Sequence, residues 1–161
     1  MTTSLRLFVA VVAASALGVA ALAGGPAPSD NVLEIVIGSG PHAGTYKVPT
    51  SAVMCAYFKE GKNLAAIYKD FDANDVKTIS DAAINVLNPD EAAPKWGSVL
   101  VAFGGRDGKR GARYDVSVKG SGADSLTFSR KGKVADLAFQ GRTKDGISLH
   151  LTARCMDIET L

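Results

Sequence analysis

The chain closes with two short runs of alternating apolar and polar residues that flank a tight-turn sequence. The turn at residues 143–146 ends in Asp-Gly, which favours a β-hairpin because glycine readily adopts the positive φ that such turns require. After the turn every second residue is apolar, and this series ends at Cys155. The pattern therefore predicts a hairpin whose second strand points Cys155 into the core.

The N-terminal segment is typical of a secretory signal peptide. Arg6 precedes an apolar run that ends in a small-residue cleavage site at residues 21–23. The alternative is an uncleaved membrane anchor, for which the run is near the minimum length. Without a cysteine after the run there is no lipoprotein signal, so the sequence predicts a secreted or periplasmic protein with no membrane span in the mature chain. We expect a signal peptide at residues 1–23, a flexible linker at 24–30, one β domain at 31–157 and a C-terminal tail at 158–161.

The chain contains two cysteines, Cys55 and Cys155, which stand 100 positions apart. Two cysteines in an exported chain predict one disulfide. Closing a loop of this length removes up to ~4.7 kcal/mol of denatured-state entropy in the chain-entropy model. Two free buried thiols are the alternative. A metal site is less favoured because a closed zinc site needs four ligands.

Short apolar runs separated by turn signals continue along the rest of the chain. Residues 31–37 and 96–103 are apolar on both faces, which predicts buried central strands. Residues 76–87 fit a helical stripe as well as two short strands with a bend at Asp81, and we favour the strands. The fold class is therefore all-β, an antiparallel β-sandwich or open barrel with one core disulfide, leaving open one short helix near 76–87.

Two resemblances rest on short motifs. Gly-Pro-His-Ala-Gly-Thr-Tyr at residues 40–46, the closing hairpin at 139–146 and Cys155 three positions after Thr152 resemble small exported bacterial proteins of unassigned function. Residues 64–70, followed by Val-Lys at 76–77, and the cysteine spacing are similar to mycobacterial lipoprotein antigens of the LpqH type. The latter resemblance implies a β-sandwich and a single disulfide, without the lipid anchor because the acylated cysteine is missing. Neither resemblance supplies a catalytic residue.

A basic loop is the first candidate binding site. It would suit an anionic polymer, although basic residues also protect exposed strand edges, and we favour that second interpretation. The loop contributes Arg106, Lys109, Arg110 and Arg113.

An acidic segment is the second candidate. It places oxygen-bearing side chains at positions one, three, five and twelve of a calcium loop. The sixth position is Asp75 where such a loop requires glycine, so a solvated acidic turn is the favoured interpretation. The candidate ligands are Asp70, Asp72, Asn74 and Asp81.

Catalytic motifs are missing from the sequence. His42 lies in a glycine-rich loop without the Gly-Lys-Ser/Thr ending of a phosphate-binding loop. His150 lies on the polar face of the last strand, and a triad with Asp136 or Asp145 stays open, but the Gly-x-Ser-x-Gly elbow is missing. We therefore expect no enzymatic activity and no cofactor.

The expected function is a binding or structural component of the cell envelope or extracellular space. Its partner would be an envelope protein, a lipid or an anionic polymer, and nucleic acid is not expected. Two alternatives stay open. One is a carrier of a lipid or small apolar ligand lined by residues 31–37 and 96–103, and the other is an anion-binding module built on the basic loop.

Overall fold

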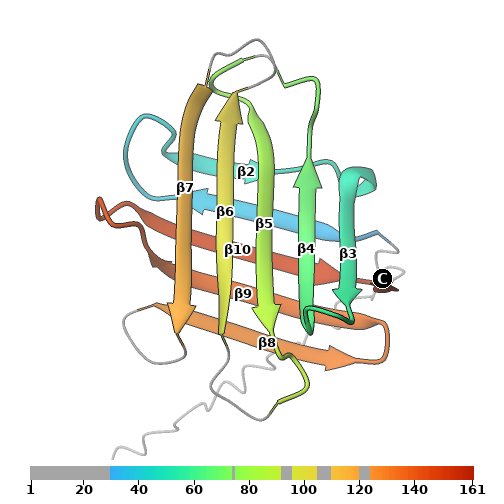
Figure 1. Cartoon of the computed structure of the whole chain (residues 1–161). Helices are drawn as coiled ribbons and strands as arrows, with labels where there is room; N and C mark the ends of the chain where they lie inside the picture. The colour runs from blue at the N-terminus through green and yellow to red at the C-terminus, as the bar shows by residue number, and fades with distance from the viewer. Residues whose placement is uncertain (1–29, 74, 92–95, 105–109, 120–123) are drawn as a thin grey trace, which may run out of the picture.

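The computed structural model describes residues 30–73, 75–91, 96–104, 110–119 and 124–161. They form two separate β-sheets that pack face to face with their strands crossing steeply, so the fold is a sandwich (Figure 1). The five-stranded sheet has the order β2 (Gly44–Lys47), β1 (Val32–Ile37), β10 (Ser148–Cys155), β9 (Val134–Arg142) and β8 (Ser125–Lys131). The six-stranded sheet has the order β11 (Glu159–Thr160), β3 (Val53–Phe58), β4 (Asn63–Lys69), β5 (Ile79–Leu87), β6 (Trp96–Gly104) and β7 (Arg110–Lys119).

The closing hairpin and the disulfide are confirmed. β9 and β10 pair antiparallel on either side of the predicted Asp-Gly turn, where Gly146 has a φ of +79°. Cys155 on β10 is bonded to Cys55 on β3, with their Cα atoms 5.8 Å apart. Because β3 and β10 belong to different sheets, the disulfide ties the two layers of the sandwich together.

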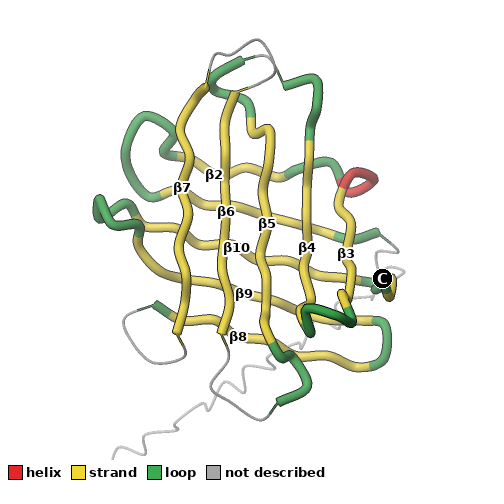
Figure 2. The backbone as a smooth tube through the Cα atoms, viewed as in Figure 1, coloured by secondary structure: helices red, strands yellow, loops and turns green. Residues whose placement is uncertain are grey.

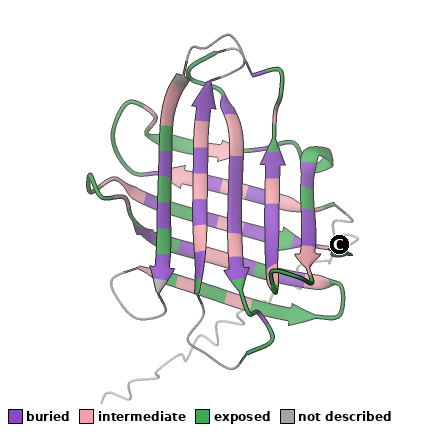
Figure 3. Ribbon diagram, in the orientation of Figure 1, coloured by how far each residue is buried: buried purple, intermediate pink, exposed green. Residues whose placement is uncertain are grey.

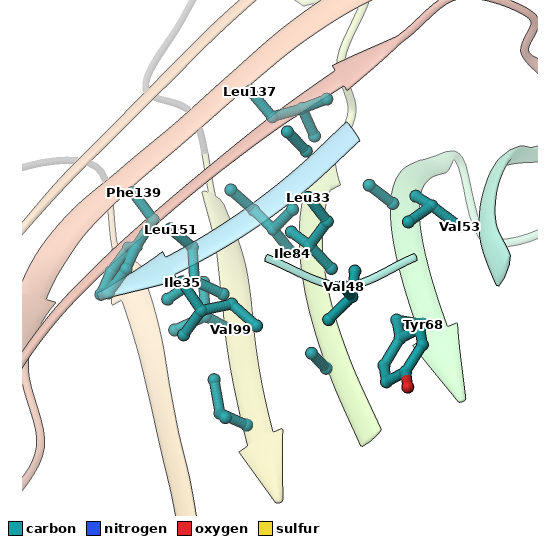
Figure 4. Packing of buried hydrophobic residues seen from close by; sticks show 14 of the residues in the cluster. Leu33, Ile35, Val48, Val53, Tyr68, Ile84, Val99, Leu137, Phe139 and Leu151 are labelled. Carbon is teal, nitrogen blue, oxygen red and sulfur yellow. The ribbon is translucent and has the colours of Figure 1, made fainter. Parts of the chain in front are cut away.

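The core lies between the sheets and draws apolar side chains from both. Figure 4 shows Leu33, Ile35 and Leu151 of the five-stranded sheet facing Ile84 and Val99 of the six-stranded sheet. All five side chains are at most 1% exposed. Full burial of an aliphatic side chain contributes about 1.5–3 kcal/mol, so this layer supplies the main stabilisation of the fold.

The helix left open near residues 76–87 does not form, and one continuous strand replaces the two short strands that we favoured. Residues 79–87 make one strand, β5, with a bulge between Ile79 and Asp81, and residues 76–78 are a turn and bend. The inward residues Ala82, Ile84 and Val86 alternate with outward ones, which is the strand period. The described helical structure is a single 3₁₀ turn, Thr50–Ala52, shown in red in Figure 2.

The predicted C-terminal tail, residues 158–161, is part of the sandwich. Ile158 is 2% exposed and belongs to the core, and the strand β11 that follows it adds to β3 in parallel. Leu161 closes this edge, because its backbone N–H donates to the Tyr57 carbonyl while its own carbonyl accepts from the N–H of Lys59. One apolar residue and a two-residue strand give too short a pattern to predict.

Burial of β6 on both faces, which we expected, is wrong for its outer face. The inward residues Val99, Val101 and Phe103 are buried, while Leu100 is only half-buried and Trp96 is 44% exposed. The same alternation of buried and more exposed residues runs along β5 and β6 in Figure 3. None of the described elements forms a third layer over this face of the six-stranded sheet.

Candidate functional site

The outer face of the five-stranded sheet is mostly polar. His150, Gln140, Thr152 and Thr127 point away from the core on neighbouring strands, as the alternating burial shows. Ion pairs also lie on this face, joining Glu34 to Lys47 at 3.5 Å and Arg154 to Asp136 at 3.8 Å. A shallow hollow of about 380 Å³ lies over β1, β8, β9 and β10. This face has the composition of an ordinary solvated sheet surface.

The outer face of the six-stranded sheet is largely apolar on β3 to β6, whereas Arg113, Asp115 and Ser117 point outward on β7. Cross-strand pairing puts Met54, Ile67, Ala83 and Leu100 side by side in one row that crosses four strands. We call this row the first ridge. Met54 is 41% exposed, and Ile67 and Leu100 are half-buried. An uncharged row across four neighbouring strands is unusual on a sheet that faces water, where polar residues are the rule.

A second apolar row lies four residues further along the strands. Phe58, Leu87 and Trp96 occupy it, with Asn63 between Phe58 and Leu87. We call this row the second ridge. Leu87 is 42% exposed and Phe58 is half-buried. The sheet therefore presents two apolar ridges on the same face.

Small and medium-sized side chains separate the two ridges. This intervening row, which we call the valley, consists of Ala56, Ala65, Asn85 and Ser98. Both alanines are 0% exposed, because the larger side chains on either side stand above them. The outer face is therefore corrugated, with a low row between two higher ones.

A hollow of about 760 Å³ opens at the β3–β4 side of this surface. Phe58 and Ile67 from the two ridges line it, together with the amide side chains of Asn63 and Asn85. The Asn85 amide donates a long hydrogen bond of 3.5 Å to Ser98 Oγ, which leaves most of its hydrogen-bonding capacity available. Lys59 and Glu60 also line the hollow, so it combines apolar, amide and charged groups.

Charges of both signs stand beside each other around the apolar rows. Lys69 and Asp81 are cross-strand partners at one end, and Arg113 lies 3.4 Å from Asp115 on β7. Partial burial raises the pKa of the Asp81 carboxyl, although Lys69 and Arg113 act in the opposite direction. At this end of the face the rim is therefore polar, and its charges of opposite sign lie side by side.

A separate cluster around His42 fastens the two sheets at one end. His42 precedes β2 of the five-stranded sheet, and its ring stacks on Phe103 of β6 with centroids 4.1 Å apart. Its Nε2 lies 3.0 Å from the Val76 carbonyl, and its Nδ1 lies 3.0 Å from the Tyr114 hydroxyl. A carbonyl only accepts, so Nε2 carries the proton and Nδ1 accepts from Tyr114. Because both ring nitrogens are hydrogen-bonded and the ring is stacked, His42 has a structural role and is not placed as a free catalytic base.

The basic-loop candidate is described only in part. Arg106 and Lys109 lie outside the described residues, and Arg110 begins β7 without a described side chain. Arg113 is exposed on the outer face of the six-stranded sheet and pairs with Asp115. The anion-binding interpretation stays a prediction.

The acidic candidate is spread over a turn and a strand. The Asp70 carboxylate accepts the backbone N–H of Asp72, which stabilises the turn after β4, while Asp81 lies in β5. Asn74 lies outside the described residues. Among the described residues no group of three or more His, Cys, Asp or Glu is placed to hold a metal ion. The described residues therefore add no support to the calcium interpretation.

The triad considered for His150 is not assembled with Asp136. His150 faces Gln140 across the strands, whereas Asp136 lies four residues further along β9, opposite Arg154. Four residues of strand span roughly 13 Å, well beyond hydrogen-bond reach.

Comparison of the chain with protein-family models, with curated proteins and with solved structures gave no match. In the described part of the chain no helix is long and apolar enough to cross a membrane. The candidate site therefore has to be chosen from the structure alone. Its most distinctive surface is the ridged outer face of the six-stranded sheet.

Proposed function

We propose that this is a non-enzymatic exported protein that binds another macromolecule through the outer face of its six-stranded sheet. The observation that carries the proposal is the contrast between the two outer faces, one polar and one with two apolar ridges. Contiguous exposed apolar patches of a few hundred Å² are often functional on monomeric proteins. The polar rim around an apolar centre is the usual anatomy of a protein–protein interface.

The disulfide supports export. Such bonds form and persist in oxidising compartments, and Cys55–Cys155 joins the two sheets in the core. Together with the signal peptide expected at residues 1–23, it favours a secreted or periplasmic location.

The strands that we expected to line the cavity of a carrier pack against each other in the described structure. Leu33, Ile35 and Val99, from the strands that we expected to line a cavity, belong to one packed cluster between the sheets. Side chains of the five-stranded sheet face those of the six-stranded sheet, as Figure 4 shows. Protein interiors are close-packed in this way. We therefore place the binding surface outside the sandwich and not within it.

Photo-crosslinking in the protein's own host tests the proposal. A photoreactive phenylalanine replaces Leu87 on the second ridge, and in a control it replaces Ala138, which points outward from β9 on the polar face. We expect an adduct of defined mass from position 87 and none from position 138. No adduct from position 87, or equal adducts from both positions, would refute binding through this face.

A further inference from the structure

We infer that the open edge of β7 is a second interaction surface, which accepts an extended segment of another protein as an added strand of the six-stranded sheet. β7 is the outermost strand of that sheet, at the side opposite to β11. A strand edge presents backbone N–H and C=O groups that pair readily with another chain, and strand addition is a general mode of peptide recognition. This inference goes beyond the binding proposed for the ridged face and does not depend on it.

The backbone of β7 is paired with β6 on one side. On β6, the Ala102 carbonyl accepts a hydrogen bond from the Ser80 hydroxyl of β5, so the backbone of Ala102 points toward β5 and away from β7. Ala102 lies opposite Arg113, and in an antiparallel ladder the residues of such a pair both point away from each other's strand. Because this direction alternates along a strand, the N–H and C=O groups of Arg113, Asp115 and Ser117 point into the edge. Among the described strands, none pairs with them there.

The β7 edge is longer and better supported than the other sheet edges. β7 has 10 residues, against four in β2, seven in β8 and two in β11. Its inward side chains Tyr114, Val116 and Val118 are at most 8% exposed, whereas the residues of β8 are all exposed or half-buried. The core therefore already holds β7 in place, and an added strand does not have to order it first.

The five-stranded sheet extends past this edge. Figure 1 shows the loop between β1 and β2 and the turn between β9 and β10 lying beyond β7. The two segments meet at their base, where the Gly38 N–H donates to the Ser148 carbonyl at 2.9 Å. A single added strand would lie over this projection. Two copies of the chain joined edge to edge would bring both projections into the same space, so we assign the edge to a segment of another protein.

The charges along the edge define the chemistry of that segment. Arg113 and Asp115 lie 3.4 Å apart on the same face of β7, with side chains 66% and 68% exposed. A row of like charges would keep an incoming strand away, but a pair of opposite charges accepts a strand that carries the complementary pair. The segment therefore has an acidic residue opposite Arg113 and a basic residue opposite Asp115. Between them it has an apolar residue on the core side, opposite the buried Tyr114.

A short capped peptide, Ala-Thr-Val-Lys-Val-Glu-Ala, tests the inference on the mature, oxidised protein. Paired antiparallel with β7, it places its Lys opposite Asp115 and its Glu opposite Arg113. Backbone hydrogen exchange, followed residue by residue by NMR, reports the pairing itself. In the free protein the N–H groups of Arg113, Asp115 and Ser117 should exchange faster than that of Val116, which points to β6. Saturating peptide should slow their exchange by at least about tenfold.

Charge variants test the recognition. Arg113→Glu should weaken binding of this peptide about fivefold, because like charges then face each other across the strands. The peptide Ala-Thr-Val-Lys-Val-Lys-Ala should instead bind Arg113→Glu more tightly than the wild type. Arg154→Glu is the matched control, because Arg154 also belongs to an exposed ion pair but lies on β10, which is paired on both sides. It should bind the first peptide like the wild type, and thermal unfolding checks that each variant is folded.

Several results would overturn the inference. One is a wild-type protein that binds no peptide at millimolar concentration. Another is slow exchange of the outward N–H groups of β7 in the free protein, which would show that the edge is already covered. Binding that leaves their exchange unchanged would place the peptide elsewhere, for example on the ridged face. Protection that rises with protein concentration without peptide would make the partner a second copy and would overturn the assignment to another protein.

Discussion

Removing the His42 side chain should destabilise the protein more than any other single change at its two histidines. His42→Ala deletes the hydrogen bond to the Val76 carbonyl, the hydrogen bond from the Tyr114 hydroxyl and the stack on Phe103. Each hydrogen bond contributes about 1 kcal/mol net, and an aromatic contact about 0.5–1.5 kcal/mol. The sum is about 2.5–3.5 kcal/mol.

Two features of the His42 site change the expected loss of stability in opposite directions. Tyr114 is 5% exposed, so its hydroxyl would lose its partner in a nearly dry place, which raises the cost. His42 itself is half-buried, and water that enters after the truncation offsets part of the loss. We therefore keep the estimate at about 2.5–3.5 kcal/mol, a large share of the roughly 5–15 kcal/mol that stabilises a typical domain.

Urea unfolding at neutral pH measures the free energy of unfolding for this series. His150→Ala is the matched control, because His150 lies exposed on the polar face and its removal should change stability by less than about 0.5 kcal/mol. His42→Phe should retain the stack and lose only the two hydrogen bonds. A double-mutant cycle with Tyr114→Phe should give a coupling of about 1 kcal/mol. Equal stabilities of His42→Ala and His150→Ala would refute the assignment.

Two further predictions concern the disulfide and one carboxylate. Replacing both cysteines with alanine should lower the free energy of unfolding by up to ~4.7 kcal/mol, because the bond closes a 100-residue loop; a urea midpoint unchanged from the oxidised wild type would contradict this. Burial raises the pKa of Asp81 above its ordinary 3.8, so the folded state binds the proton more tightly and stability falls as pH rises through that window. Asp81→Asn should therefore unfold at a higher temperature at neutral pH, with the difference vanishing in acid below pH 3.8. An Asn variant that is less stable at neutral pH would show that Lys69 and Arg113 outweigh the burial.

Local patterns were sufficient for most of the architecture. The Asp-Gly turn before Ile147 and the alternation up to Cys155 gave the closing hairpin and the direction of the cysteine, because both depend only on neighbouring residues. The pairing with Cys55 followed from there being two cysteines. An all-β sandwich could likewise be predicted from many short strands separated by turn residues.

Contacts between distant segments could not be predicted in this way. The hydrogen bond between His42 and Tyr114 joins residues 72 positions apart, and no spacing rule connects them. β11 depends on Ile158 reaching the core and on a free edge at β3, which only the folded structure provides. The helical stripe at 76–87 was ambiguous for the same reason, since β4 and β6 on either side decide in favour of a strand.

The apolar outer face shows how a wrong expectation can itself carry information. A strand that is apolar on both faces predicts a cover on both faces. Within the described residues the five-stranded sheet covers one face of β6, and on the other face Leu100 stays only half-buried. The two-sided apolar pattern of β6 therefore fits the proposal that another molecule binds this face.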